Sequence, residues 1–400
     1  MSPRKSFQGL LEPYQGEAVD ILDDLVRHAV NHDASDIHLE PKIDRMQVRF
    51  RIDGAMVEHR SIGNDVGKEV VSRIKVLARM DISERRLPQD GQMSLSLGLP
   101  ARTHLRASTF PSSQGEKVVL RILLAQSVHA FERLGMTPQV QRRVKELVTA
   151  PHGFVVTCGP TGSGKTSTLY ALLQHLDTTQ VNVVTLEDPI EVELDGITQG
   201  QANVRTGFTF AAGLRAILRQ DPDVILVGEI RDAETAAIAL QAALTGHLVM
   251  STLHTSDSVE TVVRLVDLGV EPWIIANALS AIIAQRLVRV ACGNCRENVP
   301  LEHDLWDGDE VLLAAGTMVV RPKGCAQCLR TGYRGRTGIF EFLEVDDELR
   351  ELIKAKASSH AYREILARRK IPSLRRAGFD KVQAGITTVD DVMRVTAGGG

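Results

Sequence analysis

The chain has 400 residues, of which 43% are hydrophobic and 24% charged, and its formal net charge is −3. This length exceeds one compact core, so we expect two or three domains. The composition is that of folded proteins, and the slightly acidic balance argues against a protein that wraps nucleic acid by charge alone. No apolar run reaches the ~20 residues that span a bilayer. Because the first residues also lack the apolar segment of a signal peptide, we expect a cytoplasmic chain.

The N-terminal third alternates helical and extended patterns. The expected elements are a disordered tail (1–16), a helix (17–32), two strands (36–41 and 46–54), a second helix (66–80), and three extended runs that end near residue 124. Together they predict a small α+β domain over residues 17–125. A linker over 126–138, closed by Pro138, follows it.

From residue 139 the pattern changes to strands that alternate with helices. The expected strands are GFVVTC (153–158), VNVVTLE (181–187), PDVILVG (222–228) and HLVMSTLH (247–254), and helical stretches lie between them. Nearly continuous apolar strands separated by helices predict an α/β core with a parallel sheet covered on both faces. We place this core over residues 139–288.

The stretch GPTGSGKT matches the phosphate-binding loop G-x-x-x-x-G-K-[ST], between a predicted strand and a predicted helix. Its glycines let backbone N–H groups point at phosphates, and the helix N-terminus favours an anion. Lys165 is expected to contact the β- and γ-phosphates of ATP, and Thr166 to ligate Mg²⁺. The expected nucleotide-binding residues are Gly159, Pro160, Thr161, Gly162, Ser163, Gly164, Lys165, Thr166 and Ser167.

Two acidic strand ends are candidates for the chemistry of hydrolysis. Glu229 follows VILVG and is placed to orient or deprotonate the attacking water, although Glu187, at the end of VTLE, is an alternative base. In an ordinary second nucleotide-binding motif an aspartate stands just before this glutamate, but here the residue is Gly228. The carboxylate that binds Mg²⁺ must therefore come from elsewhere, and Asp188 or Glu187 is expected to supply it. Helix N-capping by Asp188 and by Asp232 is the simpler alternative for the acidic pairs.

Histidines flank the fourth strand of the core. His247 and His254 stand at its two ends in GHLVMSTLHT. A single strand histidine is usually a buried residue with its hydrogen bonds satisfied. Two of them beside a nucleotide site suggest a sensor of the phosphate that couples hydrolysis to movement.

Four of the five cysteines form two C-x-x-C pairs, CGNC and CAQC, with 29 residues between the pairs. Two pairs of thiolates complete a tetrahedral site of the structural Zn²⁺ type, and the predicted ligands are Cys292, Cys295, Cys325 and Cys328. Redox-active dithiols or unpaired buried cysteines are the alternatives, and Cys158 is expected to be a small buried residue. We place the insert over 289–340 and a helical C-terminal subdomain with a tail over 341–400.

GPTGSGKT, LEDPIE, LRAILRQDPDVILVGEIRD and TGHLVMSTLHT, in this order, resemble the secretion ATPase superfamily, the hexameric motors of type II secretion and type IV pilus assembly. Upstream, SDIHLEP, RFRIDG and RRLPQDGQ resemble its PAS-like N-terminal domain. The resemblance covers roughly residues 17–395. It implies a RecA-like α/β core, preceded by a small PAS-like α+β domain and carrying a zinc-binding insert.

The same resemblance suggests arginines that stabilise the transition state from another domain or subunit. Such a residue contributes ~10³–10⁵ in rate where it has been measured. The candidates are Arg106, Arg121, Arg215 and Arg219. Solvated arginines are the default alternative for any one of them.

The function that the resemblance implies is a homo-hexameric, magnesium-dependent ATP hydrolase that powers pseudopilus assembly and protein export by a type II secretion system. Pilus extension is the first alternative, and a RecA-like nucleic-acid motor or a non-hydrolysing zinc scaffold are further ones. Expected partners are the cytoplasmic arm of the type II L protein and the polytopic F protein. Nucleic acid is not expected, and acidic phospholipid is a possible contact of the basic stretch 366–381. Type II members carry a further N-terminal docking domain, which we expect to be absent here.

Overall fold

The computed structural model describes residues 14, 16–97, 103–123, 130–308 and 310–397. Most of the predicted tail, residues 126–129 of the predicted linker and the last three residues lie outside the described parts. Contacts within the chain divide it into two compact units, residues 1–126 with 326–331 and residues 127–325 with 332–400.

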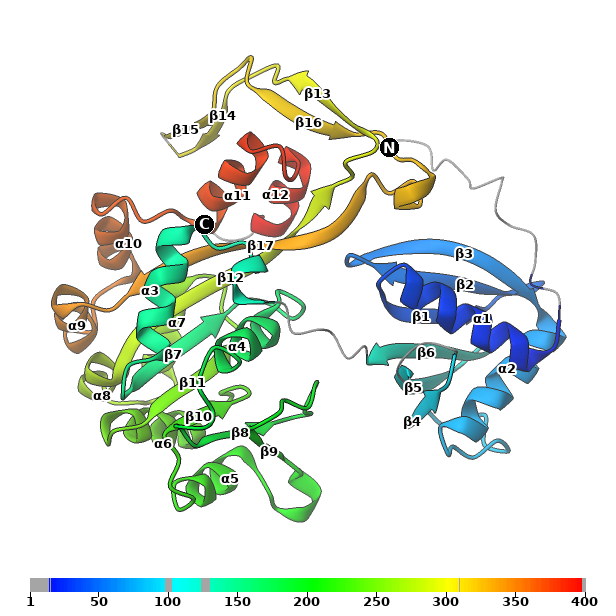
Figure 1. The fold of residues 1–400 in the computed structure, drawn as a ribbon, viewed down its shortest axis with the longest axis horizontal. Coiled ribbons are helices and arrows are strands. Elements are labelled where there is room, and N and C mark those ends of the chain that lie inside the picture. The colour runs from blue at the N-terminus through cyan, green and yellow to red at the C-terminus, as the bar shows by residue number, and fades with distance from the viewer. Residues whose placement is uncertain (1–13, 15, 98–102, 124–129, 309, 398–400) are drawn as a thin grey trace. The chain divides into compact units, whose positions relative to one another are not determined.

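The first unit is an antiparallel sheet covered on one face by two helices (Figure 1). Its six strands run in the order β3-β2-β1-β6-β5-β4, and both helices contact strands of this sheet. The elements are α1 (Ala18–Asn31), β1 (Ala34–Pro41), β2 (Arg45–Ile52), β3 (Ala55–Gly63), α2 (Asn64–Leu77), β4 (Gln89–Leu95), β5 (Thr103–Ser112) and β6 (Gly115–Leu123).

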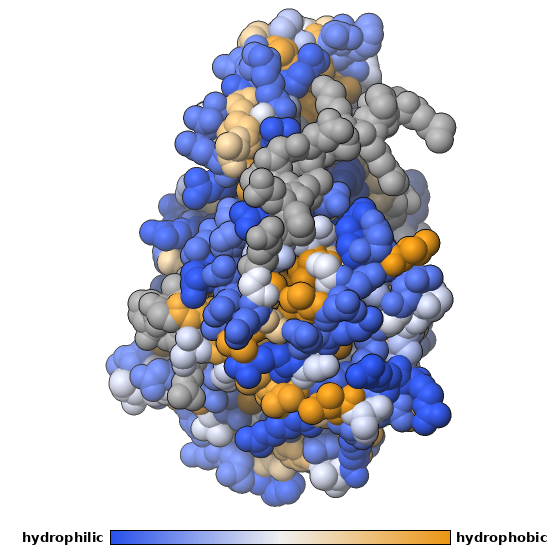
Figure 2. Space-filling model, turned by 90° about the vertical axis from the view of Figure 1, so that its right-hand side faces the viewer, coloured by the Kyte–Doolittle hydropathy of each residue, from blue (hydrophilic) through white to orange (hydrophobic). Residues whose placement is uncertain are grey.

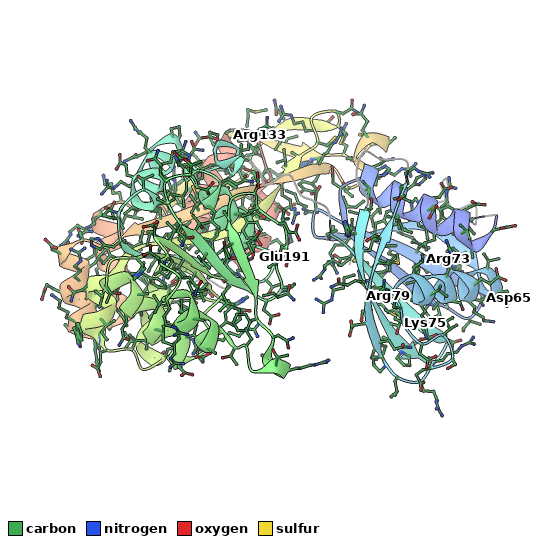
Figure 3. All side chains as sticks on the ribbon, turned by 60° about the horizontal axis from the view of Figure 1, so that its bottom comes forward. Asp65, Arg73, Lys75, Arg79, Arg133 and Glu191 are labelled. Atoms are coloured by element: carbon green, nitrogen blue, oxygen red, sulfur yellow. The ribbon has the colours of Figure 1, made fainter. Side chains whose placement is uncertain are left out.

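Side chains of this sheet alternate between an apolar and a polar face. Along β5, Leu105 and Ala107 are buried, whereas Arg106 and Ser108 are exposed, because successive residues of a strand point to opposite faces. Lys75 on α2, labelled in Figure 3, is 1% exposed; its Nζ donates to the Glu84 carbonyl at 2.7 Å and pairs with Glu116. The hydrogen bond ties the loop before β4 to the helix, and the ion pair ties the helix to the start of β6.

Two features of this unit differ from the sequence prediction. The strand β3 was not predicted, although it forms a hairpin with β2 through Asp53 and Gly54, whose φ angles of 49° and 78° both favour a tight hairpin turn. The disorder predicted through residue 16 is wrong at Tyr14, which is 8% exposed and donates its backbone N–H to Ser61 at 2.9 Å.

The second unit is built on a seven-stranded sheet with strand order β17-β12-β7-β11-β10-β8-β9. All neighbouring pairs are parallel except β12 with β17. In chain order the elements are the short 3₁₀ helix η1 (Phe131–Arg133), α3 (Pro138–Val148), β7 (Gly153–Cys158), α4 (Lys165–Leu173), β8 (Val183–Glu187), β9 (Thr198–Gln201), η2 (Val204–Thr206), α5 (Phe210–Ile217), β10 (Val224–Val227), α6 (Ala233–Leu244), β11 (Leu248–Leu253), α7 (Ser258–Asp267), α8 (Pro272–Ala278), β12 (Leu279–Ala291) and β17 (Tyr333–Glu344).

Both faces of this sheet are covered, which explains why the inner strands β7, β8, β10 and β11 are buried along their whole length and mostly apolar. On β7, Phe154 and Val156 belong to the core on one face, and Val155 belongs to the core on the other. The α/β class with a parallel sheet is therefore confirmed. Residues at the end of the predicted linker also join this unit, because Phe131 and Leu134 are buried in the second of these cores.

The remaining elements form the insert and the C-terminal helices. They are β13 (Arg296–Pro300), β14 (Leu305–Asp307), β15 (Glu310–Leu313), β16 (Met318–Pro322), η3 (Ala326–Cys328), α9 (Asp347–Lys354), α10 (Ser359–Arg368), α11 (Leu374–Gln383) and α12 (Val389–Thr396). The insert lies between β12 and β17, which pair from Ala281 with Glu344 to Ala291 with Tyr333. The boundary predicted at residue 340 thus falls inside a strand of the main sheet.

The surface is mostly polar. Figure 2 shows hydrophilic residues over most of one face, with apolar residues in small patches. Within the described residues, every helix is too short or too polar to cross a bilayer.

Candidate functional site

The phosphate loop leaves the carboxyl end of β7 and opens α4. Gly159, Gly162 and Gly164 have φ angles of +150°, +80° and +90°, a region that residues with a Cβ rarely adopt. A Cβ on Gly159 would lie 2.6 Å from the carbonyl oxygen of Gln285, and one on Gly164 would lie 2.8 Å from the Nε2 atom of the same residue. The loop is therefore packed directly against β12, and only glycine fits at these two positions.

Lys165 and Ser163 give the loop the properties of an anion site. Lys165 is 8% exposed, and its Nζ donates to the carbonyls of Gly159 and Pro160 at 2.7 and 3.1 Å. Burial lowers the pKa of this ammonium group. Ser163 Oγ is buried without a hydrogen-bond partner among the described residues. A buried cation, an unsatisfied hydroxyl and the N-terminus of α4 together fit the phosphates of ATP.

Glu229 follows β10 and forms the centre of a charged group. Its carboxylate pairs with Arg231 and lies 3.4 Å from Nε2 of His254, which follows the neighbouring strand β11. Gly228, just before Glu229, packs closely against the end of β8, because a Cβ there would lie 3.3 Å from the Cα of Glu187. The sequence analysis missed Arg231, although it stands two residues after Glu229 in the quoted motif.

Glu187, at the end of β8, accepts hydrogen bonds from neutral side chains, whereas Glu229 lies beside an arginine and a histidine. Glu187 is 3% exposed and accepts hydrogen bonds from the Tyr170 hydroxyl, from Thr185 Oγ1 at 2.7 Å and from Gln199 Nε2 at 3.1 Å. Burial, and then the Glu187 carboxylate, raise the pKa of Tyr170. Neither Tyr170 nor Gln199 carries a sequence signal for this contact.

Helix N-capping was the alternative role for Asp188 and Asp232, and the structure supports it for Asp232 alone. Asp188 is exposed and no helix begins after it, so it is not an N-cap. Asp232 is the N-cap of α6 and accepts a hydrogen bond from the backbone N–H of Thr235 at 2.8 Å. The exposed carboxylate of Asp188 therefore stays free of a capping role.

The two histidines lie at opposite ends of β11. Because β11 is parallel to β7, His254 stands at the edge where the phosphate loop begins, and His247 stands at the other edge. Nδ1 of His247 lies 2.9 Å from the Ala242 carbonyl oxygen, next to the end of α6. The structure therefore brings His254, and not His247, to the group around Glu229.

The predicted arginines occupy two separate surfaces. Arg215 on α5 pairs with Glu234 at 2.6 Å, and Nη1 of Arg219, two residues after the end of α5, donates to the Arg215 carbonyl at 2.8 Å; both arginines are exposed. Arg106 and Arg121 are directly opposite each other on β5 and β6 of the first unit. Opposed like charges destabilise a sheet. Arg121 pairs with the buried Asp36 at 3.0 Å, whereas Arg106 has no carboxylate partner among the residues that the structure describes.

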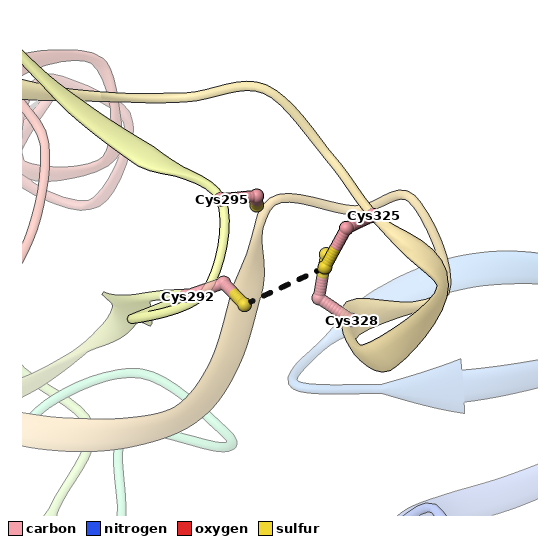
Figure 4. Close-up of side chains that lie close together, drawn as sticks. All are labelled: Cys292, Cys295, Cys325 and Cys328. Atoms are coloured by element: carbon pink, nitrogen blue, oxygen red, sulfur yellow. Dashed lines mark hydrogen bonds between the residues drawn. The ribbon is translucent and has the colours of Figure 1, made fainter.

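The four cysteines of the two C-x-x-C pairs lie together (Figure 4). All four sulfur atoms are within 4.8 Å of one another, and Sγ of Cys292 lies 4.0 Å from Sγ of Cys325. A tetrahedral site with Zn–S bonds of ~2.3 Å requires sulfur atoms ~3.8 Å apart, whereas a disulfide requires ~2.05 Å. This cluster has the donor set and spacing of a metal site. Cys158 is buried elsewhere, and burial raises its pKa to about 12.

A family model described as "Type II/IV secretion system protein" matches residues 14–394. The chain belongs to this family. It is 49% identical over 379 residues to a type II secretion system protein E of Klebsiella pneumoniae, covering 94% of this chain and 76% of that protein. It is 47% identical over 384 residues to the type II secretion system ATPase E of Vibrio cholerae, covering 94% and 75%.

Solved structures of an ATPase and of a pilus motor share the fold. The Legionella pneumophila ATPase DotB superposes with a TM-score of 0.71 at 23% identity, covering 97% of this chain and 98% of that one. The pilus retraction motor PilT with bound ADP superposes with a TM-score of 0.62 at 25% identity, covering 95% and 97%. The chain is an ATP-hydrolysing secretion ATPase of the type II kind, and the pilus-extension alternative is not favoured.

Proposed function

We propose that the chain acts as a homo-hexamer at the cytoplasmic face of the inner membrane, where it hydrolyses ATP to drive pseudopilus assembly and export by type II secretion. The observation that carries this proposal is the 47–49% identity to type II E proteins over 94% of the chain. The geometry supports it, since Glu229 and His254 lie together at the carboxyl edge of the sheet, where the phosphate loop begins.

The proposed division of labour follows from burial and partners. Lys165 would exchange its two loop carbonyls for the β- and γ-phosphates. Glu229 would orient and deprotonate the attacking water, because its carboxylate lies beside Arg231 and His254 and, among the described residues, accepts no hydrogen bond from a hydroxyl or amide group. Glu187 already accepts three hydrogen bonds and would support the site rather than act as base.

Magnesium and zinc are both proposed from the donor groups. Thr166 at the exposed start of α4 and the exposed carboxylate of Asp188 offer oxygen ligands of the kind that Mg²⁺ prefers. Bound there, Mg²⁺ would neutralise charge on the phosphates. The four thiolates of the insert would hold a structural Zn²⁺, since they leave no open ligand position for catalysis.

Arginines from both surfaces are proposed to complete the site between subunits. Arg106 and Arg121 would act from the N-terminal domain, which we propose to be PAS-like, and Arg215 and Arg219 from the core. If they act across subunits, the ATPase rate per chain rises with protein concentration. A flat profile would remove this assignment.

The proposed partners are the cytoplasmic arm of the L protein and the polytopic F protein of the secretion platform, and no nucleic acid. The basic stretch 366–381 gives little support to a lipid contact. Its side chains bond within the chain: Arg368 and Arg369 to Glu348, Arg375 to Asp307 at 2.7 Å, Arg376 to Asp380 at 3.1 Å, and Lys381 to the Gly135 carbonyl at 2.9 Å.

The deciding experiment compares exported proteins and surface pili in a deletion strain. Loss of exported proteins with pili retained supports the proposal, and complementation with a Lys165→Ala variant must fail to restore export. Loss of pili with normal export would overturn it. Restoration of export by Lys165→Ala would show that the chain acts as a scaffold without hydrolysis.

A further inference from the structure

Arg286 lies behind the phosphate loop and has an unusual set of partners. The strand β12 runs parallel to β7, with Ile283 opposite Thr157 and Ala284 opposite Cys158, so the next two residues of β12 pass beside the loop. Nη1 of Arg286 donates to the Gln285 carbonyl at 2.9 Å, and Nη2 donates to the Ser256 carbonyl at 2.8 Å. In the described parts of the chain no carboxylate forms an ion pair with it.

This guanidinium touches two segments that the proposed mechanism uses. A Cβ built on Gly159 would lie 3.1 Å from Nη1, so Arg286 packs against the first glycine of the phosphate loop. The carbonyl that it binds on the other side belongs to Ser256, two residues after His254. Because His254 lies 3.4 Å from Glu229, Arg286 connects the loop to the segment that carries the charged group.

The lack of an acidic partner distinguishes Arg286 from its neighbour Arg289. Arg289 pairs with the buried Asp391 at 2.6 Å and therefore has an ordinary structural role. Arg286 is half buried and donates to carbonyl oxygens rather than to a carboxylate, and burial lowers its pKa although nearby acidic side chains act in the opposite direction. Its position beneath an anion site gives a reason for the charge, since bound phosphates add negative potential nearby.

We propose that Arg286 is a positioning residue for ATP hydrolysis, and that it holds residues 254–257, and His254 with them, against the phosphate loop. Loss of this contact lets the segment move relative to the loop, so the water bound near Glu229 is misplaced while the phosphates are still held. A misplacement of this kind lowers the rate of the chemical step more than the affinity for substrate. The inference rests on the proposed role of His254.

The test is a double-mutant cycle on the full chain, with phosphate release measured across a range of MgATP concentrations. The variants are Arg286→Gln, His254→Ala and their combination. Arg363→Gln is the matched control, because Arg363 binds the same segment from its exposed side, at 3.1 Å from Asp257. Calorimetric titration with ADP reports how much of each preparation binds nucleotide.

The expected result is a ~10–100-fold loss of kcat in Arg286→Gln with little change in KM and an unchanged stoichiometry of ADP binding. The double variant should be no slower than His254→Ala, since both substitutions remove one function. Arg363→Gln should leave kcat and KM unaltered.

Three outcomes would overturn the inference. The first is a double variant whose fold-loss of kcat equals the product of the two single losses. The second is a loss confined to KM. The third is loss of ADP binding in both Arg286→Gln and Arg286→Lys, which would show that Arg286 is needed for folding and has no separate role in positioning. If His254→Ala by itself leaves kcat unchanged, the proposed role of His254 fails; if it lowers kcat and the effects still multiply, only the present inference fails.

Discussion

Gly159 and Gly162 allow a test of how the phosphate loop is built, because both have backbone angles that favour glycine but their surroundings differ. Both have positive φ angles. A Cβ on Gly159 would lie 2.6 Å from the backbone carbonyl of Gln285 on an interior strand of the sheet, whereas a Cβ on Gly162 would meet no atom within 4 Å. Substitution by alanine should therefore destabilise the first position more than the second.

The expected loss of stability in these variants has two parts, backbone strain and steric crowding. Gly162→Ala introduces only the strain of an L residue at positive φ, about 1–2 kcal/mol. Gly159→Ala adds the cost of overpacking against a strand that neighbouring strands hold on both sides, about 1–3 kcal/mol. In a domain of this size a kcal/mol corresponds to roughly 2–4 °C. The two variants should thus differ in Tm by about 2–12 °C, with Gly159→Ala the lower.

The assay is thermal unfolding without nucleotide, so that loss of ligand contacts does not enter the comparison. Circular dichroism of both variants under one scan rate gives the difference directly. If Gly159→Ala melts at or above the temperature of Gly162→Ala, then β12 does not pack against the loop as the structure shows.

Three further predictions concern the charged and thiol groups. Glu229→Gln should lower phosphate release by ~10²–10⁴-fold while ADP titration shows unchanged binding, and near-normal turnover would assign the base elsewhere. Cys328→Ser should release zinc and make the insert sensitive to trypsin, whereas Cys158→Ala should retain the metal; equal zinc content in both would contradict the site. Burial raises the pKa of the Glu341 carboxyl group above its ordinary value. The folded state then binds the proton more tightly, so the Tm gained by Glu341→Gln should grow as pH rises from 4.5 to 7.5, and a constant difference would refute this.

Much of the fold could be predicted from the local pattern of apolar and polar residues. The apolar strands of the core and the α/β class follow from periodicity, because a strand buried on both faces has no polar positions. The strand β3 was missed because its centre, Glu58–Arg60, is polar and exposed or half exposed, although Asp53 and Gly54 carried a hairpin signal. Tyr14 gave no sign that it pairs with the edge of that strand.

Residue types and their spacing identified the groups that carry the chemistry: the phosphate loop, two acidic strand ends, a histidine after β11 and four thiols. Which of these groups meet depends on the order and direction of the strands in the folded sheet. Glu229 and His254 are 25 positions apart and come together because β10 and β11 are adjacent and in register. His247 is excluded by the same strand direction, and Arg286 is recruited because β12 lies beside β7. Periodicity reports which face of a strand is buried, but contacts between strands depend on their order and register, which are set by packing of the whole sheet.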